Sequence, residues 1–182
     1  MPHDNVLSAD NQQGRLHEWY VSGFADGEGS FHIALYKDVR MKTGWKVIPE
    51  FHVSQRVSSR SVLDSLVQFF GCGYVKANHP TNPRDVTYVY VVRDREDLMT
   101  RIIPFFQKFP LQTEKANDFR LFAQVVELMK KGEHRQEVGI NSIIHLAYQM
   151  NGAGKYRRKN IMSVKPSETT REILRRDVGG KI

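Results

Sequence analysis

The feature that most constrains the fold is a change of periodicity near residue 28. Residues 16–26 carry apolar side chains at helical spacing, whereas from Ser30 onward apolar and polar side chains alternate as in a half-exposed strand. Gly27 and Gly29 mark the change. A helix must therefore lead directly into an antiparallel sheet.

The rest of the chain repeats this order. A second strand is predicted over 47–55, a helix over 62–70 stopped by Gly71, two more strands over 73–78 and 86–93, and a helix capped by Asp94 that runs to Lys108. Apolar-periodic helices over 113–130 and 138–150 back the sheet. The order of helix, hairpin, helix, hairpin and helix predicts an α+β fold.

Length and composition indicate one domain. The chain has 182 residues and 40% hydrophobic content, enough for a single core. We expect a flexible lead over residues 1–14, the domain over 15–150, and a basic loop and helix over 151–182. The single cysteine and the absence of an apolar run of about 20 residues predict a soluble, intracellular protein that does not engage a membrane.

Positive charge gathers at the C-terminal end. The net charge is +7, and nine Lys or Arg against three acids follow residue 150. Lys155, Arg157 and Arg158 flank an aromatic residue in a pattern that favours phosphate contacts. The alternative is a solubilising extension, because charge runs at chain ends are commonly solvated.

Two local rules are broken together near the end of the first helix. Gly23 and Gly27 lie on one helix face, and each costs about 1 kcal/mol of helix propensity relative to alanine. Asp26 and Glu28 lie at the helix C-terminus, where the helix dipole disfavours acids. A closely approaching backbone and a bound cation would explain both violations, although a simple capped turn remains the alternative.

At these residues the chain resembles the LAGLIDADG homing endonuclease family. The motif aligns as Val21-Ser22-Gly23-Phe24-Ala25-Asp26-Gly27-Glu28-Gly29, with Glu in place of the final Asp. Residues 51–55, 71–75 and 110–117 look like secondary signatures of the family. The resemblance implies the homing endonuclease fold, in which a saddle of antiparallel strands, backed by helices, binds double-stranded DNA.

The resemblance also implies a homodimer. Family members with two motifs are monomers, so a chain with one motif is expected to form a two-fold dimer on a near-palindromic site. The expected interface residues on the motif helix are Val21, Gly23, Phe24 and Gly27.

By the same resemblance, Glu28 and the backbone of Gly27 would hold Mg²⁺, with a second Glu28 from the partner. Mn²⁺ is expected to substitute for Mg²⁺, and Ca²⁺ to bind without supporting cleavage. Each strand would be hydrolysed to leave short 3′ overhangs. Gln55 and Lys115 are the further catalytic candidates. Depending on the alignment, Arg60, Ser59 or Gln112 shares the basic role with Lys115, whereas Asp26 is expected to be structural.

The polar faces of the predicted strands are the candidates for reading DNA, because a two-stranded ribbon fits the major groove. The DNA-binding candidates on the sheet and its turns are His32, Tyr36, Asp38, Arg40, Lys46, Glu50, His52, Lys76, Asn78, Tyr88 and Tyr90. The alternative is a solvated sheet face.

Two other functions fit a similar fold. One is an intron splicing factor (maturase) that binds RNA, and the other is a DNA-binding regulator without cleavage. The acid at Glu28 favours the nuclease over both. By resemblance, the gene is expected in an intron of an organellar or prokaryotic genome.

Overall fold

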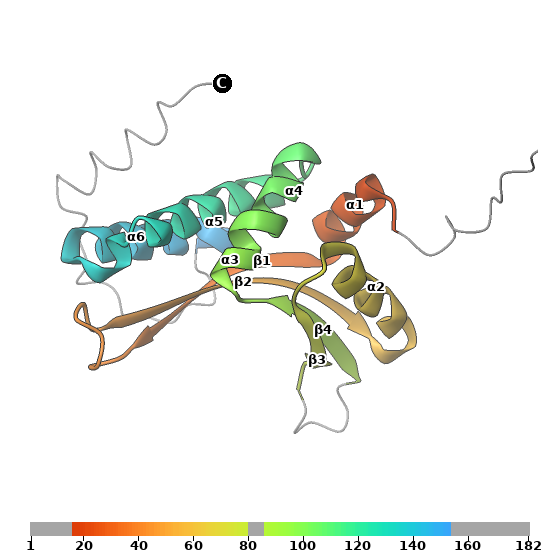
Figure 1. The fold of residues 1–182 in the computed structure, drawn as a ribbon, viewed down its shortest axis with the longest axis horizontal. Helices are drawn as coiled ribbons and strands as arrows, with labels where there is room; N and C mark the ends of the chain where they lie inside the picture. Colours follow the sequence, from red (N-terminus) through yellow and green to blue (C-terminus); the bar gives the residue numbers. More distant parts are fainter. Residues whose placement is uncertain (1–15, 80–85, 154–182) are drawn as a thin grey trace, which may run out of the picture.

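The first helix leads into the sheet without a loop. The computed structural model describes residues 16–79 and 86–153. Helix α1 (Glu18–Glu28) begins where His17 Nδ1 accepts a hydrogen bond from the Trp19 amide at 3.2 Å, and β1 (Gly29–Lys37) follows directly (Figure 1). The predicted helix and strand are confirmed, but α1 extends two residues beyond its predicted end.

The four strands form one antiparallel sheet in the order β1-β2-β4-β3 (Figure 1). The other strands are β2 (Trp45–Arg56), β3 (Tyr74–Ala77) and β4 (Thr87–Val92). A short 3-10 turn, η1 (Val57–Ser59), leads from β2 into α2 (Arg60–Phe70). Gly71 ends α2 with φ of 63°, a left-handed conformation that favours glycine. The two predicted hairpins are therefore confirmed.

The helices after the sheet follow the predicted order. Asp94 caps α3 (Arg95–Asp97) by accepting from the Glu96 and Asp97 amides at 2.9 and 3.1 Å. A π-helical turn, η2 (Leu98–Ile102), continues into α4 (Ile103–Lys108). The remaining helices are α5 (Lys115–Lys130), η3 (Glu133–Arg135) and α6 (Glu137–Ala153).

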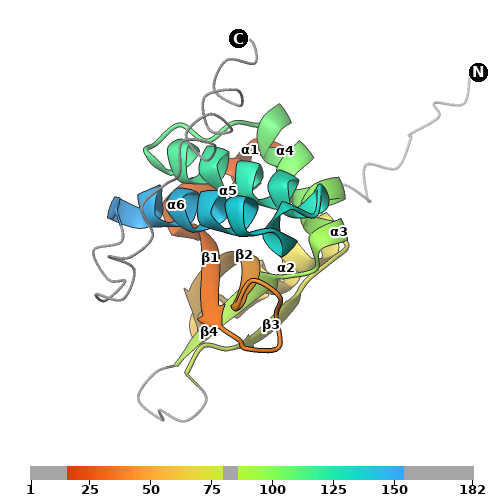
Figure 2. The same ribbon diagram turned by 90° about the vertical axis from the view of Figure 1, so that its left-hand side faces the viewer.

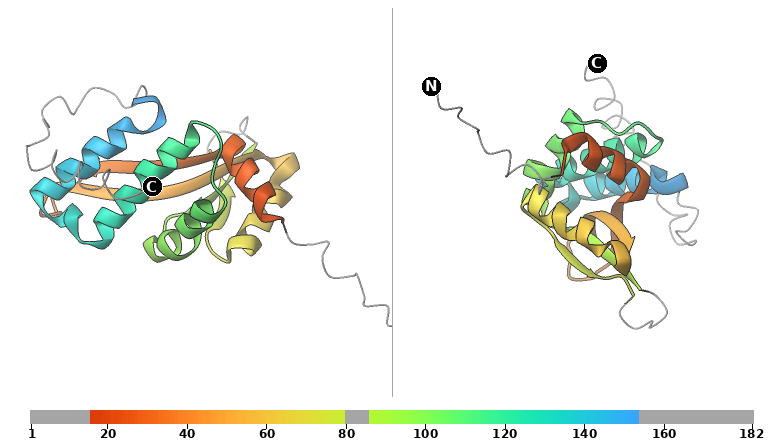
Figure 3. Two further views of the ribbon diagram at one scale, coloured as in Figure 1. Left: turned by 90° about the horizontal axis from the view of Figure 1, so that it is seen from above. Right: turned by 90° about the vertical axis from the view of Figure 1, so that its right-hand side faces the viewer.

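The helices lie on one face of the sheet, and the other face carries no described helix (Figures 1 and 2). Seen from above, α5 and α6 cross one end of β1 and β2, while α1 and α2 lie toward the other end (Figure 3). Aromatic rings fill the space between the layers. Phe31 is fully buried, and its ring centroid lies 5.1 Å from that of Phe51, 5.4 Å from Phe106 and 5.3 Å from Phe122. The predicted α+β fold is confirmed.

The predicted lead over 1–14 lies outside the described residues, and so does the predicted basic segment over 151–182 from residue 154 onward, with Lys155, Arg157 and Arg158. In the part of the chain that the structure describes, no helix is both long and apolar enough to cross a membrane.

Candidate functional site

The end of α1 brings together an exposed acid and the end of β2. Glu28 is the last residue of α1 and is exposed. Gly29 pairs with Val53, so the half-buried Gln55 lies two residues beyond that pair on β2. The adjacency follows from antiparallel pairing, because β2 runs back toward the residue at which β1 begins.

Lys115 reaches the same helix end from α5. Its Nζ donates to the carbonyl oxygens of Ala25 at 3.1 Å and Gly27 at 3.3 Å. These carbonyls belong to the last turn of α1, where the helix dipole favours a cation. Burial lowers the pKa of Lys115, and the nearby charges of Asp26 and Glu28 oppose this effect. The structure therefore places Lys115, Gly27 and Glu28 around one point.

Asp26 connects α1 to the segment before α5. Its carboxylate accepts hydrogen bonds from the Gln112 amide at 2.9 Å, the Thr113 amide at 3.1 Å and Thr113 Oγ1 at 2.6 Å. The carboxylate thus fixes the backbone two residues before Lys115. This geometry agrees with the structural role expected of Asp26, although the backbone that it holds lies 86 residues away rather than in its own turn.

The three alternatives for a second basic position differ in location, and Ser59, the last residue of η1, directly precedes Arg60 in the chain. Gln112 lies next to the end of α1, because its backbone amide binds Asp26. Its own side-chain amide donates to the carbonyl of Pro110 at 3.0 Å. Arg60 is directed elsewhere: its guanidinium lies 3.6 Å from Asp64 and stacks over Tyr88, 4.7 Å from the ring centroid.

The donor set at the end of α1 fits a hard cation only in part. Carboxylate and carbonyl oxygens are the ligands that Mg²⁺ prefers. Across residues 16–79 and 86–153, no three His, Cys, Asp or Glu side chains gather as a metal site. One chain therefore offers the Glu28 carboxylate and the Gly27 carbonyl, whose second lone pair is not needed by Lys115.

The outer face of α1 is open. Among residues 16–79 and 86–153, a Cβ atom built on Gly23 or Gly27 would have no neighbour within 4 Å. Trp19 and Tyr20 beside this face are 52% and 50% exposed, and the Tyr20 ring stacks on Phe24 at 5.8 Å. A second backbone could approach closely here.

One predicted interface residue points the other way. Val21 is 1% exposed and belongs to the core of its own chain. It occupies the opposite side of α1 from the open glycine face, so its assignment to the dimer interface was wrong. Val21, Ser22 and Ala25 are the buried side of α1.

The face of the sheet away from the helices is polar, as predicted for β1 and β2. The register pairs His32 with Glu50, Ser30 with His52, and Tyr36 with Lys46, all on the face opposite Phe31 and Phe51. On β3 this face carries the exposed Lys76 and, two residues earlier, the exposed Tyr74, which the sequence analysis did not include. The exposed Asn78 follows β3, where its amide binds the Thr87 carbonyl.

Tyr88 and Tyr90 were assigned to the wrong face. Tyr90 is fully buried, and its hydroxyl donates to the Cys72 carbonyl at 3.0 Å. Tyr88 shares that face, since it pairs with Gln55 while Tyr90 pairs with Val53. All residues from 89 to 92 are buried. Because residues on both faces of the inner strand β4 are buried, its sequence carries no alternation of polar and apolar residues from which the face could be read.

Asp38 and Arg40 lie in the turn between β1 and β2. Arg40 Nε and Nη2 contact the two carboxylate oxygens at 2.9 and 2.8 Å. Hydrogen bonds from Arg40 lower the pKa of Asp38 to about 2. The pair is bidentate, so the two predicted DNA contacts are bound to each other in this structure.

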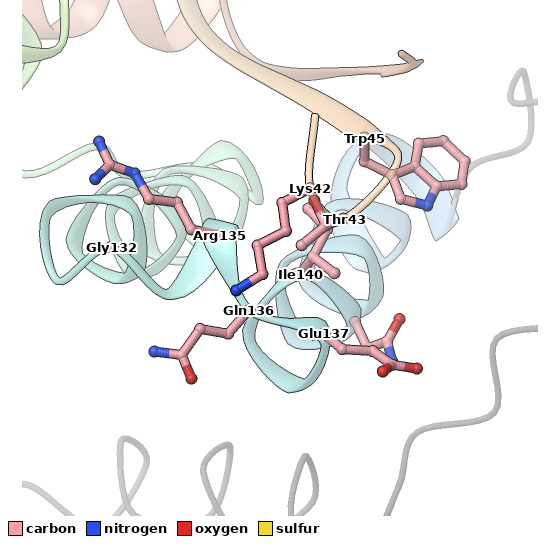
Figure 4. A pocket seen from close by; sticks show the side chains of 9 residues that line it. Lys42, Thr43, Trp45, Gly132, Arg135, Gln136, Glu137 and Ile140 are labelled. Atoms are coloured by element: carbon pink, nitrogen blue, oxygen red, sulfur yellow. The ribbon is translucent and has the colours of Figure 1, made fainter. Parts of the chain in front are cut away.

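A cleft of about 950 Å³ lies between this turn and the start of α6 (Figure 4). Lys42 and Trp45 line it from the turn, and Arg135 and Glu137 from the helical side. Thr43 Oγ1 joins the two sides through the His134 carbonyl at 3.4 Å. Charges of both signs line the cleft.

This chain is similar in sequence to known endonucleases. The sequence model of a family described as "LAGLIDADG endonuclease" matches residues 21–126. A protein of Neurospora crassa named "Probable intron-encoded endonuclease 3" is 33% identical over 145 residues, which cover 80% of this chain and 26% of that protein. The chain spans about a quarter to a third of the length of the first curated relatives that it matches.

Solved structures share the fold. The crystal structure of the homing endonuclease I-TnaI is 38% identical with a TM-score of 0.72, covering 79% of this chain and 93% of that one. The structure of the LAGLIDADG homing endonuclease I-SmaMI bound to cleaved DNA is 34% identical with a TM-score of 0.71, covering 90% of this chain and 49% of that one. I-SmaMI has also been solved on uncleaved DNA in the presence of calcium ions. The motif helix, the sheet and the family match together show that this chain belongs to the LAGLIDADG endonuclease family.

Proposed function

We propose that this chain is one subunit of a homodimeric, divalent-metal-dependent endonuclease. It cuts both strands of a long, near-palindromic DNA site and leaves short 3′ overhangs. The observation that carries the proposal is the exposed Glu28 at the end of α1. Lys115 contacts the same helix end, and the open face at Gly23 and Gly27 lies on the same helix.

The acid and the lysine have complementary tasks in phosphodiester hydrolysis. When bound at Glu28 and the Gly27 carbonyl, Mg²⁺ would activate water and neutralise charge on the leaving oxygen. Lys115, held in place by two carbonyls, presents its cation where negative charge grows on the phosphate. Gln55 at the end of β2 is suited to orient water through its amide. Mn²⁺ should replace Mg²⁺, whereas Ca²⁺ should support binding alone.

The dimer supplies the second half of the site. One chain covers about half of I-SmaMI, a protein that has been solved on cleaved DNA. Two copies packed through Gly23 and Gly27 would bring two Glu28 carboxylates close to a common axis. Phe24 and the exposed Tyr20 would then be covered by the partner helix.

The polar face of the sheet is the proposed DNA-binding surface. His32, Tyr36, Lys46 and Lys76 lie on it, and an antiparallel ribbon of this kind fits the major groove. The net charge of +7 favours a polyanion and predicts binding that weakens with salt. As with the intron-encoded relatives, we propose an intron of an organellar or prokaryotic genome as the gene's location and an intracellular site of action.

The test is site selection followed by cleavage. The full chain is incubated with randomised double-stranded DNA in Ca²⁺, bound sequences are recovered, and the recovered site is then exposed to Mg²⁺. A double-strand cut at a near-palindromic site supports the proposal. Tight DNA binding without cutting in Mg²⁺ or Mn²⁺ would instead support a regulator, and binding to structured RNA alone would support a splicing factor.

A further inference from the structure

A buried acid lies in the middle of the polar sheet face. Glu50 on β2 is 6% exposed, although its side chain points away from the aromatic core. Phe51 pairs with Val92, the last residue of β4, and Arg93 follows directly, which brings it close to Glu50 on the neighbouring strand. Arg93 Nε contacts Glu50 Oε1 directly, and His52 Nε2 lies 2.8 Å from Oε2.

Arg93, rather than His52, balances the charge of Glu50. Burial is the largest influence on His52 and lowers its pKa, which disfavours the charged imidazole, although the neighbouring Glu50 opposes this effect. Its short contact with Glu50 is also not aligned as a hydrogen bond. The cluster is therefore a buried acid in direct contact with one guanidinium, a group that is a permanent cation in proteins.

The two members of the ion pair differ in exposure. The Glu50 side chain is 8% exposed, whereas that of Arg93 is 44% exposed. An arginine has five N–H donors, and the contact with Glu50 uses the one on Nε. Glu50 thus holds the guanidinium of Arg93 at Nε, while the rest of that group is exposed on the polar face of the sheet.

Stability alone is a weak reason to keep such a pair. Burying a carboxylate and part of a guanidinium incurs a desolvation penalty that their attraction often does not exceed. Packed apolar residues would serve a purely structural purpose as well. A buried acid that fixes the orientation of an exposed arginine is instead the arrangement expected where a functional side chain must be preorganised.

We propose that Arg93 reads a guanine in the major groove of the DNA site and that Glu50 is its positioning residue. This rests on the proposed function, which puts the polar sheet face on DNA. Bidentate contact of arginine with O6 and N7 of guanine is the commonest specific contact in the major groove. Glu50, named above as a DNA contact from its position on the strand, is reassigned to holding Arg93, because it is too buried to reach a base.

The proposal predicts that Arg93 specifies one base pair in each half-site of the DNA. Replacing the guanine that Arg93 reads should weaken binding roughly 5- to 150-fold in the wild type. Arg93→Ala should abolish that preference and leave the preferences at other positions intact. A purely structural arginine would instead lower the affinity for all sequences by the same factor.

The experiment compares base preferences of full-length variants on the site selected from randomised DNA. Binding to every single base-pair substitution of that site is measured in Ca²⁺ for the wild type, Arg93→Ala and Arg120→Ala. Arg120 is an exposed arginine on α5, in the helical layer, and serves as the matched control. Arg93→Ala leaves the Glu50 carboxylate without its partner, so the double variant Glu50→Gln with Arg93→Gln, which removes both charges, is measured beside it.

Loss of a guanine preference at one symmetric pair of positions, in either Arg93 variant but not in Arg120→Ala, supports the inference. Glu50→Gln alone should reduce the same preference by a smaller factor. Unchanged base preferences in the folded Arg93 variants, on a site that the wild type does select, would overturn this inference and leave the proposed function standing. Failure of the wild type to select any site would overturn both.

Discussion

Lys115 donates a hydrogen bond from Nζ to the carbonyl oxygen of Gly27, 3.3 Å away and 88 residues earlier in the chain. The same ammonium group binds the Ala25 carbonyl at 3.1 Å. A cation from α5 thus occupies the negative end of the α1 dipole, beside the exposed Glu28. The end of α1 therefore attracts positive charge even within a single chain.

This contact predicts a specific loss of activity in Lys115→Met, which keeps the aliphatic stem but removes the charge. Cleavage of the selected site should fall about 100-fold, because a preorganised cation near the scissile phosphate is lost. DNA affinity in Ca²⁺ should change only a few-fold. The matched control is Lys130→Met, at the exposed far end of the same helix, which should cut normally. Equal effects of the two substitutions on cleavage would show that Lys115 has no specific role at the site.

The pKa of Lys115 predicts how stability depends on pH. Burial lowers this pKa below its ordinary value of 10.5 in the folded state, so the folded protein releases the proton at a lower pH than the unfolded chain does. Between those two pKa values the unfolded state binds more protons, and stability contributed by this group rises with pH.

Chemical denaturation of the wild type and Lys115→Met between pH 8 and 10.5 should therefore show the wild type gaining stability relative to the variant as pH rises. Subtracting the stability of the variant from that of the wild type cancels the contributions of the titrating groups that both proteins share. A difference that is constant or that shrinks with pH would be inconsistent with a buried ammonium.

The Asp26 carboxylate should contribute to stability rather than to chemistry. Asp26→Ala removes the acceptor for two backbone amides and the Thr113 hydroxyl, and should lower the free energy of unfolding by about 1–2 kcal/mol. Thr113→Val, which removes only the hydroxyl contact, should cost less. Urea denaturation measures both. A larger loss from Thr113→Val than from Asp26→Ala would show that the carboxylate does not organise this segment.

The open face of α1 predicts that folding and association can be separated. A Cβ added at Gly23 has no neighbour within 4 Å among the described residues, so Gly23→Leu should leave the monomer folded and the substituted helix at least as stable. The dimer should dissociate, because the added side chain keeps the two helices apart. Sedimentation velocity should show a monomer for Gly23→Leu and a weakened dimer for Gly23→Ala. A full-strength dimer of Gly23→Leu would place the interface elsewhere.

Local patterns were enough to predict the element order. The change of period near Gly29, the stop at Gly71 and the cap at Asp94 all depend on neighbouring residues, and each is present as expected. The polar face of β1 and β2 was predictable for the same reason, because only one face of these strands is buried in a continuous apolar core.

Other features depend on contacts that sequence spacing does not encode. Residues 89–92 of β4 are buried on both faces of the sheet, so polar and apolar residues do not alternate along this strand. The sequence therefore offered no way to choose the face of Tyr90, and its assignment to the DNA surface was wrong. Val21 and Gly23 share a motif, yet only the packing of α1 on the sheet decides which of them is covered. The pairing of Glu50 with Arg93 arises from the register of β2 and β4. Long-range register of this kind requires the structure.

The most direct test of the proposed nuclease is the Glu28→Gln variant, assayed with Mg²⁺ on the site selected by the wild type. Glu28 is exposed, so the fold should be unchanged, and binding in Ca²⁺ should stay within a few-fold of the wild type. Cleavage should fall by at least about 100-fold, because the carboxylate that holds the metal is lost. Glu18→Gln, the same change at the other end of α1, should cut like the wild type. Cleavage by Glu28→Gln at the wild-type rate would contradict the account.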